Sequence, residues 1–310
     1  MIEVEKLTKR YGEITAVDGI SFSIKQAEIV GILGHNGAGK TTTLKMLTGF
    51  IEPTSGLIHV DGKQMETNRL RIQKNMGYLP ENAPLYPDMT VLEYLSYVSD
   101  MWDIAESDKK NRVQTALDKT QLRPVATQLI DTLSKGYKQR VGVAQAILHQ
   151  PQIFILDEPT NGLDPTQIIH MRNLIKELSQ HATIIISTHI LQEIEAVCDR
   201  VLIIHQGKIA TDSRLADLRT SHSLCVRLDG PQEEIKQTLT GLPMVKDVTL
   251  QEQTSKCKQY RVTLKGSCDE GSPAISQIAA QKNWTLYELT QERVTLEQVF
   301  RHINEGVSHA

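Results

Sequence analysis

The sequence predicts an α/β protein with two domains, the first built on a mostly parallel β-sheet and the second a small α+β domain. Short apolar runs such as EIVGILG, IFILD and TIIIS alternate with segments of helical periodicity over the first 220 residues. Strands that are apolar throughout are typical of a parallel sheet with helices on both faces. From about residue 221 the predicted order becomes β-α-β-β-α-β, which indicates a second domain.

Length and composition are those of an ordinary globular protein. The chain has 310 residues, of which 40% are hydrophobic and 23% charged, enough for a sizeable core. A net charge of −3 offers no basic excess, so nucleic acid is not an expected partner. The cysteines lack CxxC or zinc-ligand spacing, so we expect scattered reduced thiols; they are Cys198, Cys225, Cys257 and Cys268.

No segment of the sequence has the length and composition of a membrane helix. The first residues, MIEVEKLTKR, lack the apolar stretch of a signal peptide. The longest purely aliphatic runs are Ile184–Ile186 and Val201–Ile204, far short of the roughly 20 residues that a membrane helix needs. We therefore expect any contact with a membrane to be made through another chain.

The elements of the first domain follow from local patterns. IEVEKLTKRY, ISFSI and EIVGILG are predicted strands, and a helix is predicted to begin near Lys40. Asp61-Gly62 after the strand LIHV predicts a hairpin turn. The segment of about 82–150 reads as a helical insert, in which Thr90 and Glu93 form a capping box for the helix VLEYLSYVSDM.

The second half of this domain contains two more buried strands, at 153–157 and 183–187. Between them Asp164 is the predicted N-cap and Pro165 the first-turn proline of a helix that runs through Ser179. VLIIHQGKIA then reads as a hairpin around Gln206-Gly207. We place the first domain at residues 1–220.

The remaining residues, 221–310, are predicted to form an accessory α+β domain. The strands SLCVRL, VKDVTLQE, QYRVTLK and TLYELTQ enclose the helices PQEEIKQTLTGL and SPAISQIAAQK. This order is that of a ferredoxin-like split β-α-β fold. A final helix is predicted at roughly 296–303.

The strongest functional motif follows the strand EIVGILG. GHNGAGKT at 34–41 matches the phosphate-loop pattern GxxxxGK[ST] and lies between a buried strand and a helix, the context that this motif requires. Its glycines let backbone N–H groups turn inward to hold an anion, Lys40 can reach the β- and γ-phosphates, and the Thr41 hydroxyl can ligate Mg²⁺. The sequence therefore predicts a nucleoside triphosphate site whose candidate residues are Gly34, Asn36, Gly37, Ala38, Gly39, Lys40, Thr41 and Thr42.

Two carboxylates end the strand IFILD. Asp157 and Glu158 come at the carboxyl end of a buried strand, where ligands bind in open α/β sheets. Asp157 suits a magnesium ligand. The next side chain points elsewhere and can accept a proton from an attacking water, so Glu158 suits a general base. The alternative is a solvated acidic turn.

Further motifs select one family among the proteins with phosphate loops. LSKGYKQR at 133–140, just before the strand IFILD, resembles the LSGGQ signature of ABC ATPases. Thr160–Pro165 resembles the D-loop of that family and Ser187–His189 its switch histidine, while Tyr11 resembles the aromatic that stacks on adenine. The resemblance covers about residues 2–220, with the motifs in the family's order.

This resemblance implies a P-loop NTPase fold with an antiparallel β subdomain and a helical subdomain. It implies that Ser134 and Gly136 face the γ-phosphate held by a second subunit, so that ATP joins a head-to-tail dimer, and that Asp164 belongs to the same interface. It makes His189 a γ-phosphate contact; a purely structural histidine is the alternative. For Tyr11, a simple Tyr-Gly turn is the alternative to stacking on adenine.

One position departs from the family pattern. GYLPEN at 77–82 resembles the Q-loop, in which a glutamine usually touches Mg²⁺ and links to the membrane partner. Here Glu81 takes that place, and a carboxylate can still ligate magnesium. An exposed loop acid with no role is the alternative. Lys135 and Tyr137 also depart from the plainest LSGGQ spelling, at positions where the family varies.

Taken together, the resemblance implies the ATP-hydrolysing subunit of an ABC exporter that uses ATP and Mg²⁺. Its expected partners are membrane-spanning permease subunits and a second ATPase subunit, either a copy of this chain or a related one. It would be cytoplasmic and peripheral on the inner face of the cell membrane. A soluble ABC ATPase without a transporter is the main alternative. A P-loop kinase or GTPase is disfavoured, because the sequence has no NKxD-type guanine motif and a kinase has no use for the signature segment.

Overall fold

The structure is a computed structural model that describes residues 1–219, 223–254, 257–291 and 295–305. The chain divides into two compact units, Met1–Leu215 with Phe300–Ala310, and Ala216–Val299. The domain boundary predicted at 220–221 falls outside the described residues. Each unit is described on its own below.

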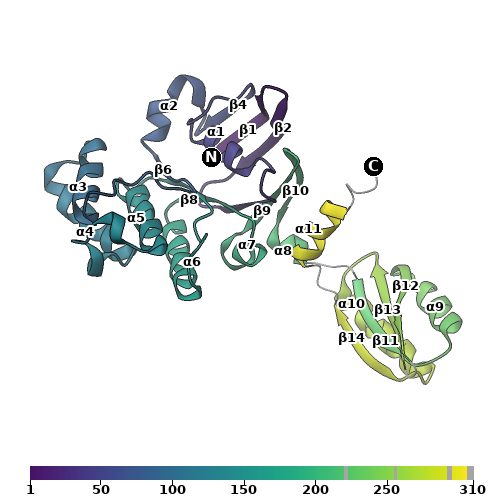
Figure 1. Ribbon diagram of the computed structural model, residues 1–310. Coiled ribbons are helices and arrows are strands. Elements are labelled where there is room, and N and C mark those ends of the chain that lie inside the picture. The colour runs from purple at the N-terminus through teal and green to yellow at the C-terminus, as the bar shows by residue number, and fades with distance from the viewer. Residues whose placement is uncertain (220–222, 255–256, 292–294, 306–310) are drawn as a thin grey trace. The chain divides into compact units, whose positions relative to one another are not determined.

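A six-stranded sheet forms the centre of the first unit, in the order β10-β9-β3-β8-β7-β6 (Figure 1). All its neighbours pair in parallel except β9 and β10, so the predicted mostly parallel sheet is confirmed. The strands are β3 (Ile29–Leu33), β6 (Met76–Leu79), β7 (Ile153–Asp157), β8 (Thr183–Thr188), β9 (Arg200–His205) and β10 (Lys208–Arg214).

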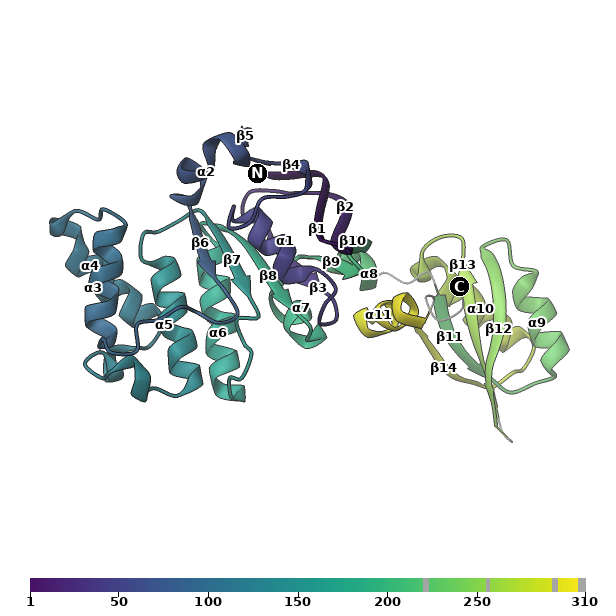
Figure 2. The ribbon, with the colours of Figure 1, turned by 45° about the horizontal axis from the view of Figure 1, so that its top comes forward.

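Helices cover both faces of this sheet, as strands without a polar side require. α1 (Lys40–Leu47) lies between this sheet and a second, antiparallel sheet, and its apolar side chains join one core with both. α6 (Pro165–Ser179) and α7 (Leu191–Val197) lie on the other face (Figure 2). α6 has the predicted bounds, and Asp164 with Gln167 forms its capping box.

The antiparallel sheet has the order β2-β1-β4-β5. Its strands are β1 (Ile2–Tyr11), β2 (Ile14–Ile24), β4 (Ser55–Val60) and β5 (Lys63–Gln64), followed by α2 (Met65–Gln73). β2 begins six residues before the predicted ISFSI, because shifts in its register with β1 carry the pairing past Gly19. The predicted turn at Asp61-Gly62 is confirmed, with φ of +49° and +73°, as a two-residue hairpin prefers.

The insert between β6 and β7 is helical, as predicted. It contains α3 (Val91–Met101), α4 (Glu106–Lys119), two 3₁₀ turns at Arg123–Val125 and Ile130–Thr132, and α5 (Lys135–Ile147). The capping box of Thr90 and Glu93 is present at the start of α3. The predicted turn at Gln206-Gly207 joins β9 to β10, again with positive φ at both residues.

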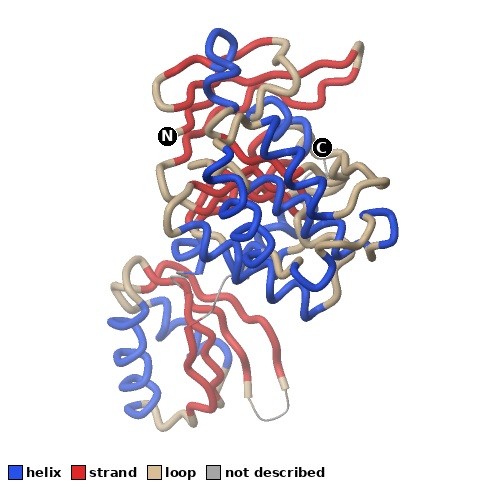
Figure 3. Tube along the Cα trace, turned by 90° about the vertical axis from the view of Figure 1, so that its left-hand side faces the viewer, coloured by secondary structure: helices blue, strands red, loops and turns tan. Residues whose placement is uncertain are grey.

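The second unit has four strands in the order β12-β13-β11-β14, all antiparallel to their neighbours. Two helices lie along this sheet (Figure 3), and their apolar side chains share one core with alternate residues of the strands. This confirms the ferredoxin-like arrangement. Its elements are β11 (Ser223–Leu228), α9 (Gln232–Thr240), β12 (Val245–Gln253), β13 (Lys258–Leu264), α10 (Cys268–Gln281) and β14 (Leu286–Gln291). Two short helices, α8 (Leu215–Arg219) and α11 (Leu296–Glu305), flank it in the sequence.

The start of α10 was predicted wrongly. The pattern favoured a start near Ser272, with Pro273 in the first turn, whereas the helix begins at Cys268 and contains Pro273. Ser267 caps this earlier start by accepting a hydrogen bond from the N–H of Asp269, and Asp269 and Glu270 suit the positive end of the helix dipole. These gains offset the hydrogen bond that the proline cannot donate.

His149 ties the helical insert to the central sheet. Its ring stacks on Trp102 at a centroid distance of 3.9 Å, and its Nε2 contacts the carbonyl oxygen of Met76 at 3.0 Å. Burial lowers the pKa of His149 to about 4. The folded chain therefore holds this imidazole neutral near neutral pH.

This lowered pKa predicts an acid-sensitive contribution to stability. Between pH 6.5 and about 4 the unfolded chain binds a proton that folded His149 does not, so the free energy of unfolding falls as pH falls. The loss is up to about 3 kcal/mol. In urea titrations across this range, His149→Gln should flatten the pH dependence, while His181→Gln, at an exposed site, should keep it. An unchanged slope in His149→Gln would contradict the assignment.

Candidate active site

The phosphate loop connects β3 to α1, as predicted. Gly37 and Gly39 have φ of +81° and +106°, a region that side chains other than glycine rarely adopt. A Cβ atom at Gly39 would collide with the carbonyl oxygen of Ala16, and one at Gly34 with that of Ile204. The loop therefore needs glycine both for its backbone shape and for its packing.

Lys40 begins α1 and lies almost buried at the base of this loop, 6% exposed. Its Nζ donates a hydrogen bond to the carbonyl oxygen of Gly34 at 2.8 Å and lies 3.5 Å from Glu158 Oε1. A buried ammonium is costly without such partners. The structure thus joins the predicted lysine of the loop to the predicted general base.

A cavity of about 420 Å³ opens over the loop. It brings together predicted residues from the loop, from the ends of β7 and β8, and from the segment after β6. Its lining residues are Ala16, His35, Asn36, Gly37, Gly39, Lys40, Thr41, Thr42, Glu81, Glu158, Asn161 and His189. A concave, polar site next to a helix N-terminus suits an anionic ligand.

Asp157 has the environment of a cation ligand. It is the last residue of β7 and is fully buried. Its Oδ1 accepts hydrogen bonds from the hydroxyls of Thr41, at 3.3 Å, and Ser187, while its Oδ2 has no hydrogen-bond partner among the described residues. A buried carboxylate oxygen without a donor, beside a threonine hydroxyl, fits the oxygen ligands that Mg²⁺ prefers.

Glu158 has a left-handed backbone, with φ of +50°, and its carboxylate contacts other residues than that of Asp157 does. Its Oε2 lies 2.9 Å from His189 Nδ1, so the imidazole N–H can donate to the carboxylate. Glu158 is nearly buried, whereas the His189 side chain is 45% exposed toward the cavity. A non-glycine residue in this conformation is unusual, and such strain is concentrated at functional sites.

Two further residues of this site were not predicted as ligands. Ser187 lies beside Asp157 in the parallel pairing of β7 and β8, and its hydroxyl also accepts from the N–H of Glu158 at 3.3 Å. Asn161 Nδ2 lies 3.5 Å from Glu81 Oε1 across the cavity. A polar residue at a strand end was the available signal for Ser187, since the carboxyl ends of parallel strands share one edge.

Gly34, Ala38 and Asp157 do not line this cavity in the described chain, and neither do four predicted ligands outside the phosphate loop and β7. Tyr11 ends β1 and is half exposed, with Lys9 Nζ 5.3 Å from its ring centroid. Ser134 caps α5 by accepting from the N–H of Tyr137, and Asp164 caps α6. Gly136 packs on the amide of Gln167, with which a Cβ atom would collide. The nucleotide-binding roles of Tyr11, Ser134, Gly136 and Asp164 stay predictions.

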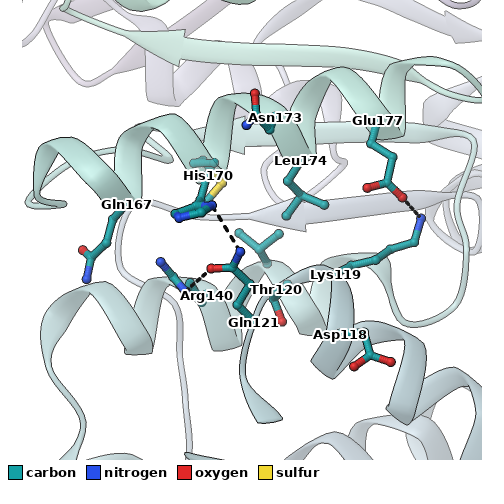
Figure 4. A pocket seen from close by; sticks show the side chains of 12 residues that line it. Asp118, Lys119, Thr120, Gln121, Arg140, Gln167, His170, Asn173, Leu174 and Glu177 are labelled. Atoms are coloured by element: carbon teal, nitrogen blue, oxygen red, sulfur yellow. Dashed lines mark hydrogen bonds and ion pairs between the residues drawn. The ribbon is translucent and has the colours of Figure 1, made fainter. Parts of the chain in front are cut away.

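A second cavity, of about 330 Å³, separates α6 from the helical insert (Figure 4). Gln121 bridges it, with 3.1 Å contacts to both Arg140 Nη1 on α5 and His170 Nδ1 on α6. Lys119 Nζ and Glu177 Oε1 form an ion pair of 2.7 Å beside it. Polar contacts across a cavity therefore connect the helix that begins after Ser134 to the helix that begins after Asp164.

Comparison with known proteins agrees with this geometry. The sequence profile of the family described as "ABC transporter" matches residues 17–161. The bacitracin transport ATP-binding protein BcrA of Bacillus licheniformis is 44% identical over 211 residues, which cover 67% of this chain and 68% of BcrA. The linearmycin resistance ATP-binding protein LnrL of Bacillus subtilis is 35% identical over 243 residues, covering 78% of this chain and 76% of LnrL.

Solved structures share the fold of the first unit. An ATP-binding subunit of an ABC transporter has a TM-score of 0.65 at 31% identity, over 71% of this chain and 92% of that subunit. A bacterial ABC transporter cassette solved as a dimer has a TM-score of 0.65 at 26% identity, over 69% of this chain and 99% of the cassette. The same cassette solved with ADP and phosphate after hydrolysis has a TM-score of 0.64. This chain belongs to the ABC transporter family, as an ATP-hydrolysing subunit of the exporter type.

Proposed function

We propose that this chain binds MgATP in the cavity over Lys40 and hydrolyses it within a head-to-tail dimer to drive export through separate membrane-spanning subunits. The observation that carries the proposal is the convergence of Lys40, Glu158 and His189 on one cavity beside the phosphate loop. That arrangement offers a cation for phosphate, a carboxylate for an attacking water and a hydrogen-bond donor that positions the carboxylate.

Binding of the triphosphate competes with contacts that Lys40 already makes. Its ammonium is held by the Gly34 carbonyl and by Glu158, and phosphate oxygens are stronger partners for it. Transfer of the ammonium to the β- and γ-phosphates leaves the Glu158 carboxylate free to accept a proton from water. His189, which contacts Glu158, then lies next to the γ-phosphate.

Thr41 and Asp157 are the residues that would hold Mg²⁺, with Glu81 as a further ligand from the far side of the cavity. The ion supplies positive charge that neutralises the phosphates. Glu81 adds a negative charge to this site where the family usually has glutamine. Its contact with Asn161 connects the Q-loop to the D-loop within one chain.

The second half of the site comes from another subunit. Ser134, Gly136 and Asp164 lie at two helix starts away from the cavity. A helix start with a serine hydroxyl and backbone N–H groups suits a phosphate, and a head-to-tail pair would bring it onto the partner's ATP. A copy of this chain suffices for such a pair. The solved dimeric cassette supports this assembly.

The membrane-spanning partner is proposed to dock near the helical insert. No helix in the described part of the chain combines the length and apolarity of a membrane span. Large apolar side chains are exposed on the insert and in the segments that precede it in the sequence. On the insert they include Tyr86, Leu92, Tyr97 and Met101, and before it Phe50 and Leu70. Exposed apolar surface of this kind is typical of interaction sites. The chain would then be cytoplasmic, at the inner face of the cell membrane.

The residues from 221 onward form, in this proposal, an accessory domain that supports or regulates the dimer. Export is favoured because relatives are named for bacitracin transport and linearmycin resistance.

Glu158→Gln should bind MgATP but lower turnover by at least about 100-fold, because an amide cannot accept the proton. Steady-state phosphate release measures turnover, and light scattering at saturating MgATP should show a stable dimer. Lys40→Ala is the matched control that loses nucleotide binding itself. Wild-type turnover in Glu158→Gln would remove Glu158 from the mechanism, and a strictly monomeric Glu158→Gln form would reject the ATP-dependent dimer.

Glu81→Ala should raise the Mg²⁺ concentration required for half-maximal ATPase activity, because the ion loses a carboxylate ligand. The measurement is a Mg²⁺ titration at fixed ATP. Asp88→Ala, at an exposed acid in the same segment, should leave the curve unchanged. If both variants titrate like the wild type, and Glu81→Ala also keeps coupled transport, Glu81 is only an exposed loop acid.

Leu70→Glu and Tyr86→Glu should weaken co-purification with the membrane-spanning subunit, because each puts a charge into the apolar contact. The readout is the chain's share in the membrane fraction with the partner co-expressed. Ile14→Glu, an equally exposed apolar site on β2, is the control. Equal loss in all three variants would reject this docking surface.

A further inference from the structure

Glu193 is a buried carboxylate that no step above uses. It lies in the first turn of α7 and is 4% exposed. Among the residues that the structure describes, its carboxylate meets hydroxyl groups and no cation. An ionised or polar group buried in this way costs free energy that an apolar residue would not. A role other than packing would explain why a carboxylate occupies this buried position.

The two carboxylate oxygens of Glu193 bind two different segments, the turn after β7 and the end of β8. Oε1 accepts a hydrogen bond from the hydroxyl of Thr160, and Oε2 accepts one from the hydroxyl of Thr188 at 2.8 Å. Both threonines are buried. The Thr188 hydroxyl also accepts from the N–H of Ile190 at 3.1 Å, so the residues on either side of His189 are held in one hydrogen-bonded turn.

These contacts close a ring around the proposed catalytic pair. Thr160 lies two residues after Glu158, and Thr188 immediately precedes His189. One side of the ring is the contact of 2.9 Å between Glu158 Oε2 and His189 Nδ1. The other side is Glu193, which is hydrogen-bonded to both segments through Thr160 and Thr188. The length of this side chain therefore bears on the separation of Glu158 and His189.

We propose that Glu193 is a positioning residue for hydrolysis, which acts by tying the segment after Glu158 to the segment before His189. It touches neither the phosphate loop nor the cavity, so nucleotide binding does not depend on it. The inference rests on the proposed roles of Glu158 and His189. Because the bridge needs two hydrogen bonds rather than a charge, an amide of the same length can replace the carboxylate.

The test compares steady-state ATPase kinetics of the full chain across substitutions at Glu193. Glu193→Ala should lower kcat about 10- to 100-fold, the usual cost of a misplaced catalytic group, with KM for ATP within about twofold. Glu193→Gln should keep kcat within about fivefold of the wild type, because its amide accepts from one threonine and donates to the other. Glu195→Gln, at an exposed site on the same helix, is the control and should behave as the wild type.

Thr160→Val and Thr188→Val test the bridge with little change of volume, and they keep the test decisive if Glu193→Ala does not fold. Each removes one hydroxyl and should lower kcat without changing KM. In a double-mutant cycle, adding Glu193→Ala to His189→Ala should cost less than about threefold further, since residues that act as a unit are not additive.

The outcomes separate this inference from the function on which it rests. One outcome is that the folded Glu193→Ala chain and both valine variants keep the wild-type kcat, while His189→Ala is impaired. This overturns the positioning role of Glu193 and leaves the proposed function intact. A lower thermal midpoint with unchanged kcat makes Glu193 purely structural and also overturns it. Full activity of His189→Ala overturns the proposed role of His189 and this inference together.

Discussion

The site depends on a lysine ammonium held at the bottom of a loop with almost no access to water. Lys40 is stabilised there by the Gly34 carbonyl and by Glu158, which reaches it from the end of β7, two strands away from β3 in the sheet. Burial makes these few contacts strong. The loop therefore presents a fixed positive charge whose partner is the carboxylate that we propose as the general base. In that proposal, exchange of the carboxylate for phosphate on Lys40 couples binding to catalysis.

Much of the fold could be predicted because its signals are local. Buried strands are apolar along their whole length, and the caps at Thr90 and Asp164 come from residues three positions apart. The phosphate loop is likewise one contiguous segment. The start of α10 was missed, because the residue that caps it, Ser267, lies before the predicted segment SPAISQIAAQK.

The polar network around the site could not be predicted in the same way, because its partners are distant in the sequence. Ser187 meets Asp157 only through the pairing of β7 and β8, and Glu193 meets Thr160 only through the fold of α7. The positive φ of Glu158 also has no signature in the sequence. Local motifs and family resemblance predicted roles for single residues. The contacts that orient them required the structure.

The close packing of the loop glycines has a mechanical consequence. Gly39 leaves no space for a side chain against Ala16 of β2, and Gly34 leaves none against Ile204 of β9. The phosphate loop is thus packed closely against one strand of each sheet, β2 and β9. Amide protons in these strand ends and in the loop should therefore exchange with solvent as one cooperative block.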